Sequence, residues 1–275
     1  MDKLIDSLHA AFYEKQIIPY LGNGMMSLTS GYDVPATPEA LVAYLTSKVS
    51  VPHKIRSRLT QTAQFIENFK HRKTIVHFMN EVFAGTPKFS TFHQLLADSM
   101  PPLIVDTWYD DAMMTALAGS RSDWGQVQGL SQSEHFGTWT GWYDSKGETA
   151  TEVSPDWKTI LYKPIGGHGP AGNYLVSDTD YVEVLTEIDI QTPIPTEIQN
   201  IRTGRSFLFL GCRFNDQLTR SFARQIMKRS STAHWAVLPE EPTRMELKFM
   251  EEQNITRIPM SLKDFADQFV SSVMA

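Results

Sequence analysis

The residues best suited to chemistry stand directly after apolar runs of strand length. The first group is Gly22-Asn23-Gly24-Met25, which follows the run Ile17–Leu21. A glycine pair after a buried strand lets the backbone turn sharply, and a phosphate can then approach N–H groups where any Cβ would collide. Because Gly-x-Gly turns after strands are common, a tight strand-to-helix turn is the competing interpretation.

Three other apolar runs end in the same way. Each is followed by a short polar or glycine-rich segment, namely residues 106–111, 166–169 and 211–216. Acidic side chains, a histidine and glycine turns at such positions could hold a ligand and move a proton. Ligands of parallel α/β sheets bind beyond the carboxyl ends of the strands, so the four segments are expected to lie at one edge of a sheet.

The rest of the pattern predicts that sheet. In the last third of the chain, residues 234–238, 243–253, 255–258 and 262–270 have the spacing of strand, helix, strand and helix. Continuous apolar strands that alternate with helices indicate a parallel sheet covered on both faces. The expected fold class is therefore α/β, a Rossmann-like parallel sheet with helices on both faces and a helical and loop-rich insertion layer.

Two segments depart from this alternation. Residues 52–84 show helical spacing without a strand signal, broken near His71, and predict a helical insertion. Residues 119–156 contain tryptophans and glycines but little aliphatic sequence, which predicts a loop-rich flap with a hairpin around 139–143, either a lid or a structural element. A length of 275 residues fits a single domain over residues 1–275 that carries both additions.

Composition narrows the class of protein. Apolar residues make up 41% and charged residues 20%, and no apolar run approaches the roughly 18–20 residues of a membrane span. The N-terminal residues lack the basic start of a signal peptide, so a cytoplasmic location is expected. A net charge of −6 without a long basic run disfavours nucleic acid as a partner. The single cysteine, Cys212, excludes a multi-cysteine zinc site within this chain.

In the order and content of its strand ends, the sequence resembles the sirtuin-like NAD-binding family, in particular the bacterial branch that hydrolyses NAD instead of deacylating proteins. The family motifs Gly-Ala-Gly-x-Ser, Thr-Thr-Asn-Tyr-Asp, Lys-Leu-His-Gly and Gly-Tyr-Ser then Asp are matched by residues 22–26, 106–110, 163–166 and 211–216. The Asp-Tyr that follows the third motif falls on Asp180-Tyr181, and the family's His-containing helix on residues 92–96. The resemblance spans about residues 10–270.

This resemblance implies a Rossmann-type pocket for NAD or ADP-ribose. Its cofactor-binding residues would be Gly22, Asn23, Gly24, Met25, Trp108, Asp110, Gly166, Gly211 and Cys212. The implied reaction is cleavage of the nicotinamide N-glycosidic bond, with a small-molecule nucleotide as partner and no metal. Protein deacylation is disfavoured, because the family's deacylases carry a four-cysteine zinc module. Related bacterial proteins often form homo-oligomers and act in phage defence, which the resemblance extends to this chain.

The departures from the family pattern fall on the residues that do chemistry. Trp108 stands where the family has an Asn that orients ribose or water, and Ile165 where it has a general-base His. Neither side chain takes a proton at neutral pH. His168, three residues beyond Ile165, is the candidate replacement as catalytic residue if its glycine-rich loop can swing toward the pocket. The competing interpretation is a solvent-exposed loop histidine.

Several roles stay open at this point. Asp110 either acts at the catalytic centre, accepting from the ligand, or caps the following helix, and both can hold at once. Trp108 either stacks on the ligand or fills the nicotinamide space, and Cys212 is either a small buried residue or a reactive thiol. Three functions remain: an NAD-cleaving hydrolase, a degenerate nucleotide sensor, and a protein-interaction module whose pocket has closed.

Overall fold

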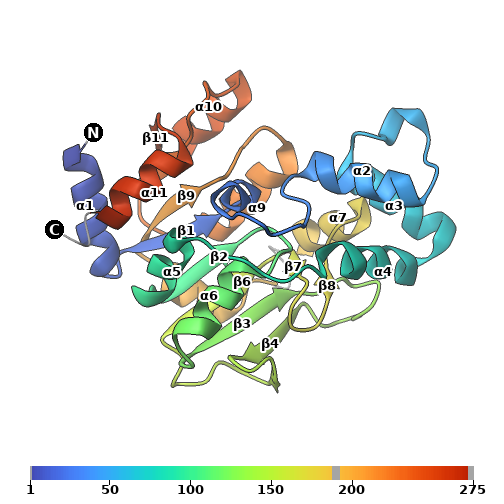
Figure 1. The fold of residues 1–275 in the computed structure, drawn as a ribbon, viewed down its shortest axis with the longest axis horizontal. Coiled ribbons are helices and arrows are strands. Elements are labelled where there is room, and N and C mark those ends of the chain that lie inside the picture. The colour runs from blue at the N-terminus through green and yellow to red at the C-terminus, as the bar shows by residue number, and fades with distance from the viewer. Residues whose placement is uncertain (1, 188–192, 272–275) are drawn as a thin grey trace.

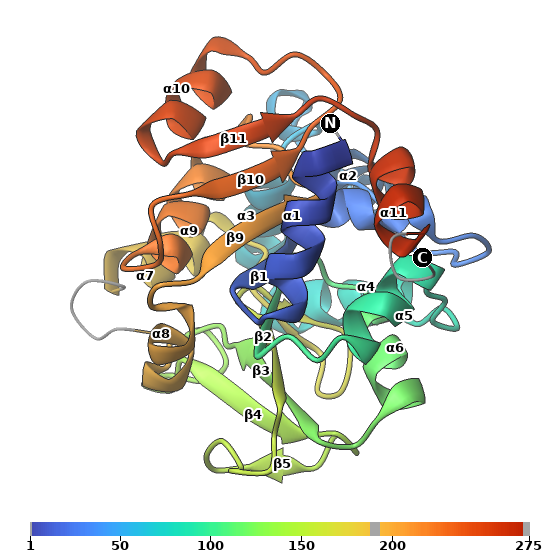
Figure 2. The same ribbon diagram turned by 90° about the vertical axis from the view of Figure 1, so that its left-hand side faces the viewer.

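A mostly parallel sheet forms the centre of the molecule. The structure is a computed structural model in which residues 2–187 and 193–271 are described. In these residues the sheet has nine strands in the order β11-β10-β9-β1-β2-β6-β3-β4-β5, which Figure 2 shows from β11 at the top to β5 at the bottom. The strands are β1 (Ile17–Leu21), β2 (Leu103–Asp106), β3 (Trp124–Gly129), β4 (Thr140–Asp144), β5 (Thr149–Ala150), β6 (Thr159–Lys163), β9 (Ser206–Leu210), β10 (His234–Val237) and β11 (Ile255–Ile258).

Helices cover both faces of this sheet (Figure 1). They are α1 (Asp2–Tyr13), α2 (Pro38–Lys48), α3 (Leu59–Lys70), α4 (Arg72–Phe83), α5 (Thr91–Asp98), α6 (Ala112–Ser120), α7 (Asp178–Glu187), α8 (Thr196–Arg202), α9 (Gln217–Met227), α10 (Arg244–Glu252) and α11 (Leu262–Ser271). Short 3-10 helices, η1 (Asn23–Leu28) and η2 (His53–Ile55), and a two-stranded hairpin of β7 (Gly166–Gly167) and β8 (Asn173–Tyr174) lie in the connections.

The alternation of side chains along the strands separates two cores. Ile17 and Leu21 of β1 pack with α1, α5, α6 and α11, whereas Ile18 and Tyr20 pack in the cluster that includes α8, α9 and α10. Successive strand residues point to opposite faces, so a strand that is apolar throughout must be covered on both sides. The expected Rossmann-like α/β fold is confirmed.

The chain reverses direction across the sheet between β1 and β9. From β1 it continues to β2 on one side, and after β6 it crosses to β9, β10 and β11 on the other side. The strands β9, β1, β2 and β6 are parallel neighbours, so their carboxyl ends share one edge, as expected. In such sheets the switch point between strands that continue in opposite directions is the usual place for a ligand.

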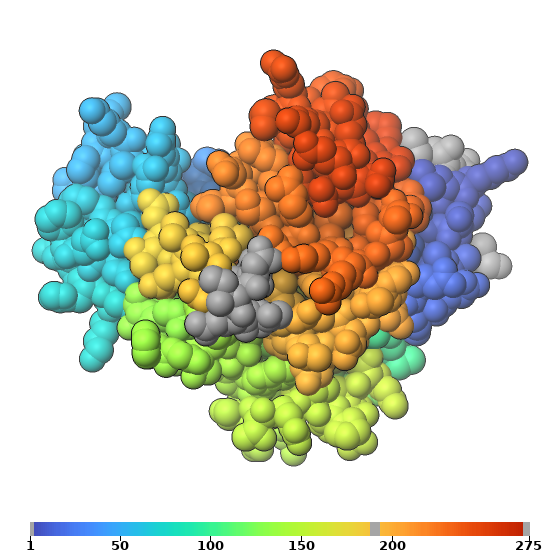
Figure 3. All heavy atoms as spheres, turned by 180° about the vertical axis from the view of Figure 1, so that it is seen from behind, coloured from blue at the N-terminus to red at the C-terminus, as the bar shows by residue number. Residues whose placement is uncertain are grey.

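The segment 52–84 folds into α3 and α4, and the break expected near His71 is confirmed by its positive φ of 72° between the two helices. Figure 1 shows α2, α3 and α4 together at one end of the molecule. Seen from behind, α7 lies between the α3–α4 pair and α9 (Figure 3), and it contacts both α3 and α9.

The expectation of a loop-rich segment at 119–156 is wrong for residues 124–129. These residues form β3, a buried strand that pairs in parallel with β6, and β4 and β5 add an antiparallel edge beyond it. Gln126 and Gln128 interrupt the apolar pattern that would indicate a buried strand. Both glutamines are nevertheless buried, because they donate hydrogen bonds to the carbonyl of Gly169. The division into one domain with an insertion and a flap stays a prediction.

Candidate functional site

The glycine turns after β1 and β9 pack against each other, backbone to backbone. A Cβ on Gly24 would lie 2.7 Å from the carbonyl oxygen of Gly211, and a Cβ on Gly211 would lie 2.5 Å from the N of Met25. Gly211 also has a positive φ of 64°, which L side chains rarely adopt. The two turns can therefore meet at the switch point only because both carry glycine.

The N–H groups of the first turn are used in this contact. Gly24 N–H donates to the carbonyl of Gly211 at 2.9 Å, and Gly22 N–H donates to the carbonyl of Leu210 at 2.9 Å. The expectation that these glycines expose their N–H groups to a phosphate is therefore wrong for this structure. Asn23, Gly24 and Gly211 are nevertheless partly exposed, so the joined turns form part of the surface.

The loop 29–37, which follows η1, covers the end of β2. Trp108 donates its indole N–H to the carbonyl of Pro35 at 2.8 Å, and Asn23 donates its amide to the carbonyl of Ala36 at 3.0 Å. The Trp108 residue is only 4% exposed and packs edge-on against Phe83 of α4. In this structure the indole fills buried space under the loop.

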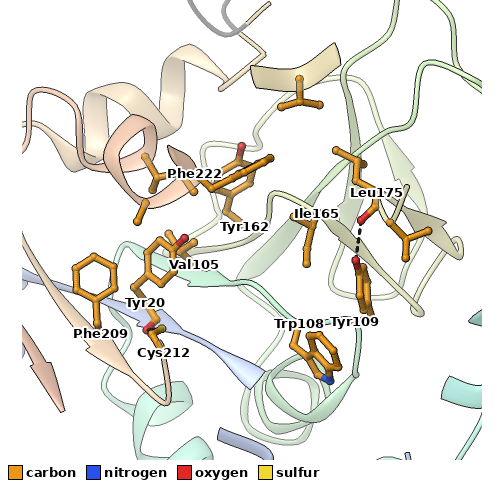
Figure 4. Packing of buried hydrophobic residues seen from close by; sticks show 14 of the residues in the cluster. Tyr20, Val105, Trp108, Tyr109, Tyr162, Ile165, Leu175, Phe209, Cys212 and Phe222 are labelled. Atoms are coloured by element: carbon orange, nitrogen blue, oxygen red, sulfur yellow. Dashed lines mark hydrogen bonds between the residues drawn. The ribbon is translucent and has the colours of Figure 1, made fainter. Parts of the chain in front are cut away.

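Ile165 belongs to the same buried cluster as Trp108, and Figure 4 shows both beside Tyr109, with Cys212 near Tyr20 and Phe209. Tyr109 donates its hydroxyl to the carbonyl of Leu175 at 2.7 Å. Burial raises the pKa of the Cys212 thiol. This geometry fits the interpretation of Cys212 as a small buried residue, since a reactive cysteine needs a lowered pKa and access.

A buried lysine joins the second and third motifs. Lys163, at the end of β6 and 1% exposed, places its Nζ 2.7 Å from Oδ2 of Asp106 and 2.9 Å from the carbonyl of Asp110. Burial opposes the charge of Lys163, but the negative charges of Asp106 and Asp110 outweigh it and raise its pKa. The lysine is thus the counter-ion for two buried carboxyl groups.

Asp110 faces the start of α6. Its Oδ1 accepts a hydrogen bond from the N–H of Ala112 at 2.8 Å, which satisfies one of the free donors at the start of a helix. Burial raises the pKa of Asp110, while Lys163 acts in the opposite direction. The expectation that Asp110 is the N-cap is wrong, because the N-cap of α6 is Asp111 and Asp110 bonds the helix from one residue earlier. A contact of Asp110 with a ligand stays a prediction.

His168 lies at the same edge and has a partner that the sequence analysis did not identify. Its Nδ1 is 2.7 Å from Oδ2 of Asp111, and Oδ1 of Asp111 accepts from the N–H of Gly169 at 2.8 Å. The hydrogen bond to Asp111 raises the pKa of His168. Asp111 also contacts the loop 29–37, because its N–H donates to the Tyr32 hydroxyl at 3.3 Å.

The loop that carries His168 is held in place. The carbonyl of Gly169 accepts from Gln126 at 2.8 Å and from Gln128 at 2.6 Å, and the N–H of His168 donates to the carbonyl of Tyr109 at 2.9 Å. A loop with these bonds does not need to swing to reach the edge of the sheet. The rival interpretation of a freely exposed histidine does not fit either, since the side chain is 28% exposed and paired.

The two remaining family positions have structural contacts. Asp180 forms a buried ion pair with Arg72 at 2.8 Å, which connects α7 to α4. His93 shares a capping box with Ser90 at the start of α5, and burial lowers the pKa of His93 to about 4. Both residues therefore stabilise the elements around the edge.

Two hollows lie beside β3 and β4. The smaller one, behind Pro164, has a volume of about 10 Å³, room for about one water. The larger one has a volume of about 470 Å³ and is lined by Gly137, Thr138, Trp139, Thr140, Trp142, Thr151, Pro193, Pro195 and Glu197. That volume is in the range of ligand pockets, but none of the residues expected to bind a cofactor lines it.

Within residues 2–187 and 193–271, no cluster of three His, Cys, Asp or Glu side chains is arranged to hold a metal ion. In the same ranges no helix has the length and apolarity to span a membrane.

The chain matches the SIR2-like domain over residues 102–258. The match begins just before β2 and ends with β11, so it includes the second, third and fourth motifs, with Lys163 at the end of β6 and Gly211 directly after β9. A comparison with curated proteins found no match.

Proposed function

Because the chain belongs to the SIR2-like family, whose members use NAD, we propose that it binds NAD or ADP-ribose where the turns after β1 and β9 meet. The observation that carries this proposal is the meeting of the four motif segments at one switch point. Gly24 donates to Gly211, Thr107 donates to Leu21 beside the first turn, and Lys163 pairs with Asp106.

The residues at this edge fit a nucleotide in part. The partly exposed Asn23, Gly24 and Gly211 would lie along the pyrophosphate, whereas the remaining cofactor residues expected from the sequence are buried. Trp108 and Ile165 occupy buried space where the nicotinamide half would be needed. Binding of a whole NAD molecule thus requires the loop 29–37 and Trp108 to move. ADP-ribose lacks the nicotinamide, so its binding requires less movement.

The finer proposal is hydrolysis of the N-glycosidic bond of NAD, with His168 as the proton acceptor and Asp110 near the reacting ribose. His168 supports it, because it is a titratable side chain, partly exposed and held at the correct edge. The alternative is a catalytically degenerate nucleotide sensor or an interaction module, which the buried Trp108 and Ile165 favour.

One pair of measurements separates these functions. Pure protein is incubated with NAD and nicotinamide release is followed, while thermal stabilisation by NAD and by ADP-ribose is measured in parallel, since a ligand of the native state raises its stability. Release that is lost in His168→Gln, but kept in His77→Gln on the exposed face of α4, supports the hydrolase. Stabilisation without release supports the sensor, and no stabilisation at millimolar nucleotide rejects both.

A homo-oligomer and a role in phage defence stay proposals from the family resemblance. Sedimentation of the protein with and without NAD would test whether assembly depends on the nucleotide.

A further inference from the structure

The pairing of Asp111 with His168 has a geometry that orients a base. Asp111 comes from the turn between β2 and α6, and His168 from the turn between β7 and β8. One carboxylate oxygen contacts Nδ1 of His168 at 2.7 Å, and the other accepts the N–H of Gly169 at 2.8 Å. The Asp111 carboxylate is thus held in place by Gly169, the residue that directly follows His168.

The surroundings of the Asp111 carboxylate are close-packed and hydrogen-bonded. The Asp111 side chain is 5% exposed, and its own N–H is bonded to the Tyr32 hydroxyl. A Cβ on Gly169 would lie 3.1 Å from Oδ1 of Asp111 and 2.7 Å from the end of Met114, so glycine at 169 permits the close approach. Gln126 and Gln128 fix the Gly169 carbonyl on its other side.

The second ring nitrogen of His168, Nε2, differs from Nδ1 in its hydrogen bonding. Within residues 2–187 and 193–271, Nε2 of His168 makes no hydrogen bond. An ionised carboxylate can only accept, so Nδ1 must carry the proton in the neutral ring and Nε2 must carry the lone pair. The other titratable groups around this pair interact electrostatically with Asp111; they are Asp110, Lys163, Tyr32 and Tyr174.

We infer that Asp111 is a positioning residue that holds His168 with Nε2 as the proton acceptor for a water molecule. This inference rests on the proposed NAD hydrolysis for its substrate. The water oxygen bonds to the anomeric carbon of the nicotinamide ribose as the C–N bond breaks. The bonding electrons leave with neutral nicotinamide, the water proton goes to Nε2 of His168 and then to solvent, and ADP-ribose remains.

The family's usual base position is occupied by Ile165, so this pair is a feature of this chain's own sequence. His168 must be neutral to accept a proton, and its pKa is raised above 6.5 by Asp111. Cleavage should therefore increase as the pH rises through the pKa of His168. In Asp111→Asn that increase should move to lower pH, because the carboxylate that stabilised the imidazolium is gone.

The test is an NMR titration of His168 in the full chain, assigned with His168→Gln. In the wild type the neutral ring should be protonated at Nδ1, and in Asp111→Asn the pKa of His168 should fall. The carboxamide presents an N–H to the ring in that variant, so the tautomer should also reverse. Asp267→Asn, at an exposed ion pair of α11, should leave the pKa of His168 unchanged.

Activity provides the second readout. Asp111→Asn should reduce nicotinamide release by up to about 10⁴-fold, the size of loss produced by the wrong tautomer of an oriented histidine. Wild-type His168 protonated at Nε2, or a pKa that does not respond to Asp111→Asn, would overturn the inference even if NAD is cleaved. If the NMR result is as expected and no nicotinamide is released at any pH, the positioning stands and the proposed hydrolysis fails. The wild-type tautomer decides the matter if Asp111→Asn does not fold.

Discussion

Gly24 and Gly211 lie on turns that follow neighbouring parallel strands, and the N–H of Gly24 donates to the carbonyl of Gly211 at 2.9 Å. Each glycine leaves no room for a side chain on the other. The contact joins the turn after β1 to the turn after β9 at the switch point of the sheet. Glycines that the sequence predicts to bind a phosphate therefore also hold the two turns together. Variants must separate the effect on stability from the effect on nucleotide binding.

The effect on stability is tested by Gly24→Ala. The added methyl would collide with the Gly211 backbone, and relief of such overpacking typically costs about 1–3 kcal/mol of unfolding free energy. Gly119→Ala is the control, because a Cβ there meets nothing within 4 Å and the site is in α6. That control should gain roughly 0.5–1 kcal/mol. Urea denaturation compares the two, and equal effects would contradict the described contact.

Lys163→Met should destabilise the protein strongly. The substitution leaves Asp106 and Asp110 buried without their counter-ion, and removing one partner of a buried pair typically costs about 3–5 kcal/mol. Lys263→Met, at a largely exposed ion pair with Asp267, should leave the stability nearly unchanged. A Lys163→Met variant as stable as wild type at pH 7 would mean that the two carboxyl groups are not ionised there.

Acid should destabilise the protein through His93. Its pKa is about 4 in the fold, because of burial, and 6.5 when unperturbed. Between these values the unfolded chain binds the proton and the folded chain does not, so stability falls as the pH drops from 6.5 toward 4. The slope approaches about 1.4 kcal/mol per pH unit.

Unfolding free energies measured from pH 7 to pH 4.5 test this. In His93→Gln the slope of the unfolding free energy against pH should be smaller, because about one proton fewer is taken up on unfolding. Some slope should persist, since burial also lowers the pKa of His234, which contributes in the same direction. His168 acts in the opposite sense, because its pKa is raised and its contribution is lost as the pH rises. A His93→Gln variant with the wild-type slope would show that His93 takes up its proton in the fold.

Trp108→Phe should loosen the loop 29–37. The phenyl ring retains most of the packing against Phe83 but cannot donate to the Pro35 carbonyl, and one such bond is worth about 0.5–1.5 kcal/mol. Limited proteolysis should then cut the loop faster than in wild type. Trp235→Phe on β10 is the control and should leave the cleavage rate at this loop unchanged.

Much of the fold follows directly from the sequence. Strands such as Ser206–Leu210 are apolar on both faces, and Thr37 with Pro38 marks the start of α2, where the Thr37 hydroxyl accepts from Ala40 N–H. The strand Trp124–Gly129 was not predictable from hydropathy, because its buried glutamines donate to the carbonyl of Gly169, 41 and 43 residues away in the chain. A partner that distant leaves no local signal.

The candidate site shows the same limit. His168 stands out because it lies on a glycine-rich turn just past the third motif, but Asp111 is 57 residues away and reads as one of several acids after β2. Only the parallel pairing of β2 with β6 brings the two turns together. Likewise, the glycine pattern predicts a sharp turn correctly, whereas the use of its N–H groups depends on β9, which comes nearly 190 residues later.

The most direct test of the nucleotide site is isothermal titration calorimetry with ADP-ribose and NAD. Ser27→Glu adds a negative charge on the exposed residue whose hydroxyl donates to the carbonyl of Gly24, without entering the glycine contact. Ser47→Glu is the matched control, since Ser47 is exposed on α2 and its hydroxyl bonds the carbonyl three residues earlier in the same way. We expect saturable binding to wild type and to Ser47→Glu, and binding at least about tenfold weaker to Ser27→Glu, a loss of roughly 1.4 kcal/mol. No binding to wild type at millimolar nucleotide, or equal affinity in the two variants, would contradict this expectation.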